Sequence, residues 1–242
     1  MALTPIFMYH HVADFSESTP LKSLFVTPHR FQQQMALMYR LGYKGLSMRE
    51  LQPYLTGEKQ GRVFGITFDD GYVDNLENAL PVLQKYGFSS TCYLVAGMLG
   101  KENVWDKELK DPHALMSVEQ VDQWLQGGQD IGAHTVQHVN LKQVAMKLAE
   151  QQIKGSKELL ENKFNRTITD FCYPYGACSE ELACVVGRYG FITATTTERR
   201  VANSCKDSPL LLPRLFITNK TTVFKLSWYL IKSIFLRFGS RG

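Results

Sequence analysis

Residues 63–72 read VFGITFDDGY, a largely apolar run that ends in two adjacent carboxylates and a glycine. The apolar run predicts a buried strand over residues 63–68. A helix is predicted for residues 80–86, where Pro81 is tolerated in the first turn. Residues 90–95 are rich in β-forming side chains and predict the next strand. A strand, a helix and a second strand in this order favour a parallel arrangement of the two strands.

The same alternation continues along the chain and predicts an α/β fold with a parallel sheet and right-handed crossovers. Because no GxGxxG motif follows a predicted strand, a closed or nearly closed barrel is favoured over an open dinucleotide-binding sheet. Residues 97–116 are polar and aromatic and predict a long loop over one face. The other predicted strands span residues 6–9, 130–133, 171–173, 191–195 and 212–217, and the other predicted helices span residues 31–41, 117–127, 143–164 and 179–189.

Length and composition indicate one globular domain. The chain has 242 residues, of which 44% are hydrophobic and 21% charged, and a net charge of +4. This charge is too weak to indicate a nucleic-acid partner. None of the five cysteines forms a CxxC pair, and the chain begins without an apolar leader. These features favour a cytoplasmic protein, or one peripheral on the cytoplasmic face of the inner membrane.

The two carboxylates of Asp69 and Asp70 follow the predicted strand directly. Parallel α/β folds place their active sites at the carboxyl ends of the strands. At a strand end the chain turns, so both side chains can reach one pocket. The alternative is a plain turn in which an aspartate acts as a cap and Gly71 supplies a positive φ.

A second polar cluster contains His134 and His138, directly after the strand predicted for residues 130–133. Histidines four residues apart lie on one face of a helical turn, a spacing that chelates metals. The alternative is a pair of solvated loop histidines. Together with Asp70 they would form a facial metal site with open positions, which leaves Asp69 free to act as a base.

Two further clusters also stand at predicted strand ends. Residues 173–176 read YPYG, and their turn exposes backbone N–H groups that can hold an oxyanion, although a plain Pro-Gly turn explains it equally. Tyr9 is followed by His10 and His11. A histidine there could protonate a leaving amine, and a core or capping histidine is the alternative.

These clusters resemble the polysaccharide deacetylase family, also called the NodB homology domain or carbohydrate esterase family 4. The resemblance spans about residues 5–217 and rests on TFDDG followed by HTxxH. It implies a distorted (β/α)7 barrel as a single domain over residues 1–220. It also implies a divalent metal ion, usually zinc, as cofactor. The implied roles are metal ligand for Asp70, His134 and His138, general base for Asp69, oxyanion donor for the Tyr175 N–H, and substrate binding for Tyr72, Tyr173, Pro174 and His11.

The chain departs from the family pattern at two places. Where the family often has an arginine ahead of the PYG turn, this chain has Cys172. Arg214 is the candidate replacement that orients the base and keeps it ionised, with a structural salt bridge as the alternative. The family's C-terminal histidine, its general acid, is also missing, because no histidine follows His138. His10 is the first candidate for the acid and His11 the second.

The C-terminal residues 221–242 form an apolar and aromatic stretch interspersed with lysines and arginines. It is too short and too charged to span a membrane comfortably. It predicts an amphipathic helix that lies on an anionic membrane surface. The alternative is a terminal helix that packs against the barrel.

The functional hypothesis is a metal-dependent hydrolase that removes an N-acetyl or N-formyl group from an amino sugar. The membrane-facing tail favours a lipid-linked substrate, an undecaprenyl-phosphate N-acetylhexosamine on the cytoplasmic face, and this resembles the branch that acts in lipid A modification. The alternatives are a deacetylase of a polymeric N-acetylglucosamine polysaccharide, a metallohydrolase of peptide-like amides and a non-catalytic carbohydrate-binding relative.

Overall fold

The computed structural model describes residues 3–106, 112–227 and 229. Its centre is an eight-stranded sheet in which every neighbouring pair is parallel. The strand order is β10-β9-β8-β7-β6-β2-β12, and β5 also pairs with β6. The strands are β2 (Ile6–Tyr9), β5 (Lys44–Leu46), β6 (Val63–Phe68), β7 (Thr91–Leu94), β8 (Asp130–Ala133), β9 (Asp170–Cys172), β10 (Thr193–Thr195) and β12 (Leu215–Phe216).

The sheet curls so that its two edge strands, β10 and β12, come close together. The residues just ahead of β12 form hydrogen bonds with β10. Leu212, just ahead of β12, forms a parallel bridge with Thr195 of β10. Its N–H donates to the Ala194 carbonyl, and its own carbonyl accepts from the Thr196 N–H, both at 2.8 Å. The result is a nearly closed, distorted barrel, which confirms the fold class predicted from the sequence.

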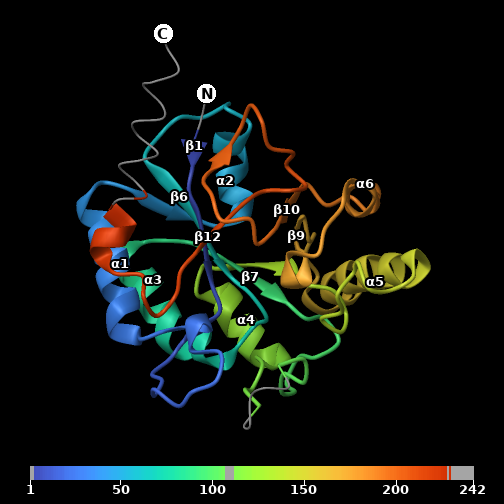
Figure 1. Ribbon diagram of the computed structural model, residues 1–242, viewed down its shortest axis with the longest axis horizontal. Helices are drawn as coiled ribbons and strands as arrows, with labels where there is room; N and C mark the ends of the chain where they lie inside the picture. Colours follow the sequence, from blue (N-terminus) through green and yellow to red (C-terminus); the bar gives the residue numbers. More distant parts are fainter. Residues whose placement is uncertain (1–2, 107–111, 228, 230–242) are drawn as a thin grey trace.

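The helices surround the strands, as Figure 1 shows. Serine or threonine side chains cap the starts of four of them, so the sequence itself sets where they begin. Ser117 and Gln120 form the complete capping box expected there. The helices are α1 (Pro28–Arg40), α2 (Met48–Leu55), α3 (Leu80–Tyr86), α4 (Val118–Gln126), α5 (Met146–Phe164) and α6 (Glu180–Arg188).

Within the central sheet and its surrounding helices, one strand and one helix, β5 and α2, were not predicted. The strand has only three residues and contains Gly45. The helix is amphipathic, with a Ser47 cap and Met48 and Leu51 buried, but it is short and contains Pro53. In the fold, Leu51 of α2 packs in a buried cluster with Ile6 and other barrel residues. A Cβ on Gly65 would lie only 2.9 Å from the Leu51 side chain, so the close contact between α2 and β6 requires glycine there.

The helix around Pro81 begins earlier than predicted. A π-helical segment, η2 (Asn75–Ala79), runs directly into α3. Proline cannot donate the backbone hydrogen bond of a helix interior, and a wider turn ahead of it relieves that mismatch. Two short strand pairs complete the structure, β1 (Leu3–Thr4) with β11 (Ala202–Asn203) and β3 (His11–Val12) with β4 (Phe25–Val26), together with the single turns η1 (Lys22–Leu24) and η3 (Pro174–Gly176).

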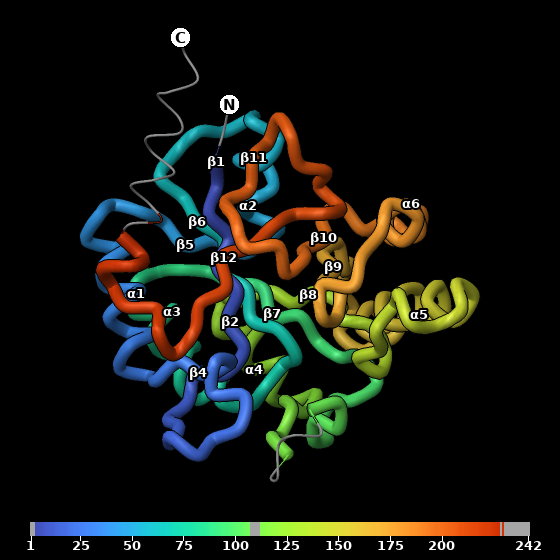
Figure 2. Tube along the Cα trace, in the orientation of Figure 1, coloured from blue at the N-terminus to red at the C-terminus, as the bar shows by residue number. Residues whose placement is uncertain are grey.

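The last continuous described stretch, residues 218–227, lies beside α1, as Figure 2 shows. The Gln34 side chain of α1 donates to the Thr221 carbonyl at 2.8 Å. Leu226 is fully buried in the main core, whereas Phe224 is 84% exposed. Most of the tail predicted to bind a membrane, residues 228 and 230–242, lies outside the described residues. Among the described residues, no helix has the length and apolar character needed to cross a bilayer.

Candidate active site

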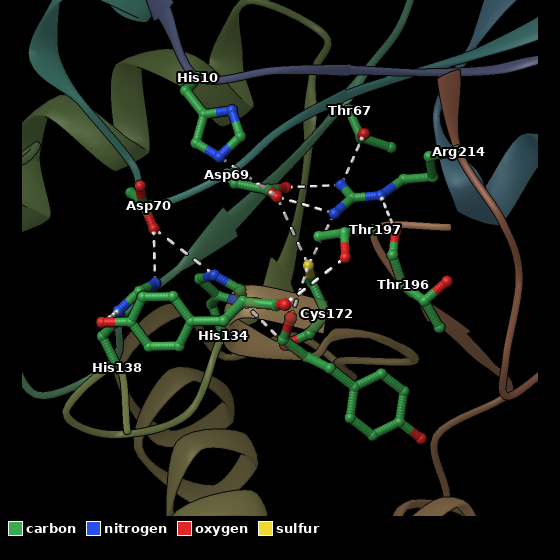
Figure 3. A network of polar contacts seen from close by, with 12 residues as sticks. His10, Thr67, Asp69, Asp70, His134, His138, Cys172, Thr196, Thr197 and Arg214 are labelled. Atoms are coloured by element: carbon green, nitrogen blue, oxygen red, sulfur yellow. Dashed lines mark hydrogen bonds and ion pairs between the residues drawn. The ribbon is translucent and has the colours of Figure 1, made fainter. Parts of the chain in front are cut away.

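Asp69 and Asp70 stand where β6 ends, and the backbone there directs their carboxylates to different partners. Asp70 has φ 77° and Gly71 has φ 87°, so two consecutive residues adopt left-handed conformations. Such backbone is costly for a residue with a side chain. In Figure 3, Asp69 is directed toward Arg214 and Asp70 toward His134 and His138.

Asp70, His134 and His138 form a compact, buried triad. An Asp70 oxygen, Oδ1, lies 3.5 Å from His134 Nε2 and 3.2 Å from His138 Nε2. One potential ligand atom from each residue lies within 4.8 Å of the others. His134 Nδ1 is 2.7 Å from the Cys172 carbonyl oxygen, which can only accept, so Nδ1 carries the proton. Nε2 is therefore the nitrogen that His134 would offer to a metal ion.

His138 is held from two sides. Its Nδ1 lies 3.2 Å from the Tyr175 hydroxyl, and the ring of Trp105 stacks on its imidazole with centroids 4.4 Å apart. The loop between the two histidines is not the helical turn that was predicted. Thr135 and His138 adopt φ 64° and 56°, so an irregular turn brings both Nε2 atoms to Asp70.

The triad fits a divalent metal ion. Asp70 Oδ1 is a buried acceptor that has no hydrogen-bond partner within the described structure. Burial alone would raise the pKa of Asp70, but the two histidines hold it well below its usual value. Two imidazole nitrogens and one carboxylate form a donor set suited to zinc and its first-row neighbours. These residues would hold the ion and leave positions open for water and substrate.

Asp69 forms a bidentate ion pair with the buried Arg214. The guanidinium donates to the two carboxylate oxygens at 2.6 and 2.7 Å. It also donates to Thr67 Oγ1 at 3.0 Å, to the Thr196 carbonyl at 3.0 Å and to Cys172 Sγ at 3.1 Å. Burial raises the pKa of Asp69, but the charge and hydrogen bonds of Arg214 outweigh it and lower that pKa. Arg214 stands just ahead of β12 and contacts both Asp69 and Cys172. Its role in orienting the base stays a prediction.

The two histidines after β2 have different environments. His10 Nε2 lies 3.9 Å from an Asp69 oxygen, and Figure 3 shows its ring directed at that carboxylate. Burial lowers the pKa of His10 despite the nearby aspartates. His11 is fully buried between the rings of Phe25 and Tyr72, and its Nδ1 lies 2.7 Å from Asp74. His11 thus lies in the interior of the fold, and a substrate-binding or acid role for it stays a prediction that this burial does not favour.

Three residues predicted to contact substrate also lie in the interior of the structure. Tyr72, Tyr173 and Pro174 are buried and offer substrate no surface. Successive strand residues face opposite sides, so Tyr173 points away from the barrel interior and its hydroxyl donates to the Leu210 carbonyl at 3.0 Å. Tyr175 is different: it is 51% exposed and has φ 59°.

Sequence reasoning missed several residues that shape the site. Trp105 and Asp106 lie on the loop that follows β7, and the Asp106 carboxylate accepts from Tyr72 and Asn103. Their position in a long polar loop after a strand could have marked them. Gln152 of α5 accepts from the N–H groups of Val136 and Gln137 at 3.1 and 3.0 Å. No sequence signal distinguishes it from the other glutamines of that helix.

Left-handed backbone is concentrated at this site. Among the described residues, six that are not glycine have a positive φ. Four of them, Asp70, Thr135, His138 and Tyr175, belong to the three loops that meet at the triad. Because such conformations persist only where the surroundings hold them, their clustering marks these loops as functional.

Comparison with known proteins agrees with this geometry. The sequence model described as polysaccharide deacetylase matches residues 56–194, more than half of the chain. The chain belongs to the polysaccharide deacetylase family. Its relatives are carbohydrate deacetylases, hydrolases that act on N-acetyl amide bonds, and the enzyme class predicted from the sequence is confirmed at this level.

Individual relatives cover most of this polysaccharide deacetylase. YxkH of Bacillus subtilis (strain 168), named as a polysaccharide deacetylase, is 30% identical over 84% of this chain and 67% of its own length. The poly-β-1,6-N-acetyl-D-glucosamine N-deacetylase of Staphylococcus aureus (strain MRSA252) is 24% identical over 88% of this chain and 74% of its own. The Streptococcus pyogenes deacetylase PplD, solved with acetate, superposes with a TM-score of 0.82 at 26% identity over 94% of this chain and 97% of that one.

Proposed function

We propose that this chain removes N-acetyl groups from a polymer of N-acetylglucosamine. The observation that carries the proposal is the pairing of two units, the triad suited to a metal ion and the Arg214-held Asp69, at the carboxyl ends of β6 and β8. The similarity to a poly-β-1,6-N-acetyl-D-glucosamine N-deacetylase supports a polymeric substrate. It favours the polymer over the lipid-linked substrate that the tail suggested, and no comparison supports the lipid-linked one. Membrane binding and the cytoplasmic location stay predictions.

The proposed roles follow from the charges of the site. A divalent metal ion held by Asp70, His134 and His138 would supply an activated water and polarise the acetyl carbonyl. Asp69 remains ionised because Arg214 lowers its pKa, so it can accept the proton of the attacking water. Its position is fixed by two short hydrogen bonds, which orient the accepting oxygen before substrate arrives.

The leaving amine needs a proton. His10 is the described imidazole nearest to Asp69 outside the triad, at 3.9 Å, and its lowered pKa leaves the ring neutral at neutral pH. A neutral ring can take the proton from Asp69 and deliver it to the amine. The Tyr175 N–H, in the turn after β9, is proposed to donate to the carbonyl oxygen as its charge develops.

Aromatic surfaces beside the triad suit a sugar chain. Trp105 stacks on His138 on one side, and the half-exposed Tyr175 contacts the same ring edge-on with centroids 4.7 Å apart. Aromatic rings combine a broad apolar face with a polar edge, as sugar rings do. The site therefore offers walls for a hexosamine next to the atoms that would cleave its amide.

Acetate release from a substrate panel tests the proposal. The panel contains β-1,6-linked and β-1,4-linked N-acetylglucosamine oligomers, an undecaprenyl-phosphate N-acetylhexosamine in detergent, and an N-acetylated peptide. We expect acetate from an oligomer, loss of activity with a chelator, and recovery with zinc or cobalt. The His134→Ala variant should be inactive, with His29→Ala, an exposed histidine on α1, as its matched control.

Each other outcome contradicts the proposal in a different way. Release from the lipid-linked sugar alone would restore that substrate as the main function. Release from the peptide alone would indicate an amide hydrolase of a different specificity. Metal binding without release from any substrate would indicate a carbohydrate-binding relative.

A further inference from the structure

A second set of potential metal ligands overlaps the triad. Asp69, His134 and Cys172 also offer one donor atom each within 4.8 Å of one another, and all three residues are buried. The two sets share His134. Because His134 Nδ1 is committed to the Cys172 carbonyl, only Nε2 is free to bind an ion. The two sets are therefore alternatives for a single ion rather than a two-metal site.

The second set has a feature that the first lacks. Arg214 donates to both Asp69 oxygens at 2.6 and 2.7 Å and to Cys172 Sγ at 3.1 Å. A guanidinium cannot lose its charge in a protein. Two of the three donors thus already face a permanent cation, which a metal ion would have to displace. The Asp70 oxygen of the first set faces instead the two imidazoles of its own set.

We propose that Arg214 selects the metal site: its guanidinium excludes the ion from the Asp69–His134–Cys172 set and confines it to Asp70, His134 and His138. The selection keeps Asp69 free as a base. It also keeps a thiolate out of the coordination sphere, although Cys172 is close enough to supply one. Without the guanidinium, a zinc, cobalt or cadmium ion would favour the set that contains Cys172, because thiolates bind these metals strongly.

Removing the guanidinium should leave Asp69 and Cys172 free to bind the ion together with His134. In an Arg214→Met variant, the ion would be bound by the Cys172 sulfur, whose proton is lost to solvent, together with Asp69 and His134. The other four cysteines of the chain are unchanged in this variant. A new metal–sulfur signal therefore reports on Cys172 alone, and the double variant Arg214→Met/Cys172→Ser is the matched control.

Cobalt titration of the metal-free full chain tests the proposal. Wild-type protein should bind one equivalent with weak visible bands and no near-ultraviolet sulfur-to-cobalt charge-transfer band. The Arg214→Met variant should show that band at one equivalent, and the double variant should lose it. A band in the wild type, or cobalt binding by the folded Arg214→Met variant without a band, would overturn the proposal.

Loss of the buried cation leaves Asp69 unpaired and can prevent folding. Circular dichroism checks each variant first, and Arg214→Gln, which can still donate to Asp69, serves if the methionine variant does not fold. The wild-type protein can also be tested directly by cadmium-113 NMR. A chemical shift in the range for nitrogen and oxygen ligands supports the proposal, and a shift in the range for thiolate ligands contradicts it. These signals are independent of deacetylation, so an inactive protein leaves this test intact.

Discussion

Two adjacent carboxylates, Asp69 and Asp70, have separate environments because of a single backbone feature. The left-handed conformation of Asp70 directs its side chain toward two imidazoles, while Asp69 remains paired with a guanidinium. One carboxylate is thus suited to bind a cation and its neighbour to accept a proton. The motif TFDDG predicted the pair, but the division of roles depends on Arg214, which lies 145 residues away from Asp69.

The adjacent histidines that follow β2, His10 and His11, give a prediction at the same scale. His10→Gln should lower kcat by about 10²-fold or more, because it removes a proton donor without removing a metal ligand. Its melting temperature and metal content should stay near wild type. His11→Gln should behave in the opposite way and mainly lower the melting temperature, since it breaks the contacts with Asp74, Phe25 and Tyr72.

Steady-state kinetics and thermal melts of the two variants check this contrast. Equal kcat loss in both variants, with equal loss of stability, would mean that the two histidines act only through the fold.

At the scale of elements, α5 fixes the loop that carries both metal-binding histidines. Gln152 is 6% exposed and accepts from two N–H groups of that loop, Val136 and Gln137. Groups that orient metal ligands commonly change metal affinity by 10–100-fold when removed. We expect Gln152→Ala to weaken zinc binding by about tenfold in a competition titration. The matched control is Gln151→Ala, because Gln151 is exposed on the same helix.

Unchanged affinity in Gln152→Ala would show that the loop holds its left-handed residues without help from α5. A loss of affinity in Gln151→Ala as large as in Gln152→Ala would assign the effect to the helix as a whole.

The elements also show what the sequence could predict. Strands β2, β6 and β8 have strong apolar patterns and were predicted with the observed bounds. The site residues that follow such strands were found because parallel strands end at one edge. Strand β5 was missed because it is short and contains a glycine, whereas α2 was missed although its Ser47 cap and its buried Met48 and Leu51 are signals of a helix.

Three side chains predicted to contact substrate lie away from the triad for a common physical reason. Tyr173, Pro174 and His11 stand beside site positions in the sequence, but strand alternation and local packing bury them away from the triad. Tyr72 is also buried, but its hydroxyl donates to Asp106 and lies against Asp70. Trp105 and Gln152 were missed for the opposite reason. Trp105 reaches the site on a loop and Gln152 on a helix, and the local sequence does not show where these two segments lie in the fold.

At the scale of the whole molecule, folding stability should depend on Asp170 at the start of β9. Burial is the main cause that raises the pKa of Asp170 to about 6. In the unfolded chain this pKa is about 4. Folding therefore favours the protonated form. The resulting stabilisation is fully present below pH about 4 and is lost as the pH rises through about 6.

The difference between the folded and unfolded pKa of Asp170 corresponds to about 3 kcal/mol in the free energy of unfolding. Asp170→Asn should remove this dependence, so the stability of the wild type relative to this variant should fall by up to about that amount between pH 4 and pH 8. Urea unfolding at both pH values measures it, with the exposed Asp14→Asn as control. An equal difference at the two pH values would mean that Asp170 does not change its protonation on folding.

The central claim is that one carboxylate of the pair binds the metal and the other activates water. It is tested most directly by measuring bound zinc and acetate release together in Asp69→Asn, with Asp70→Asn as its counterpart and the exposed Asp122→Asn as control. We predict that Asp69→Asn retains one equivalent of zinc and loses at least about 100-fold of its activity, whereas Asp70→Asn loses the zinc. Full activity in Asp69→Asn, or loss of zinc from Asp69→Asn but not from Asp70→Asn, would contradict the account.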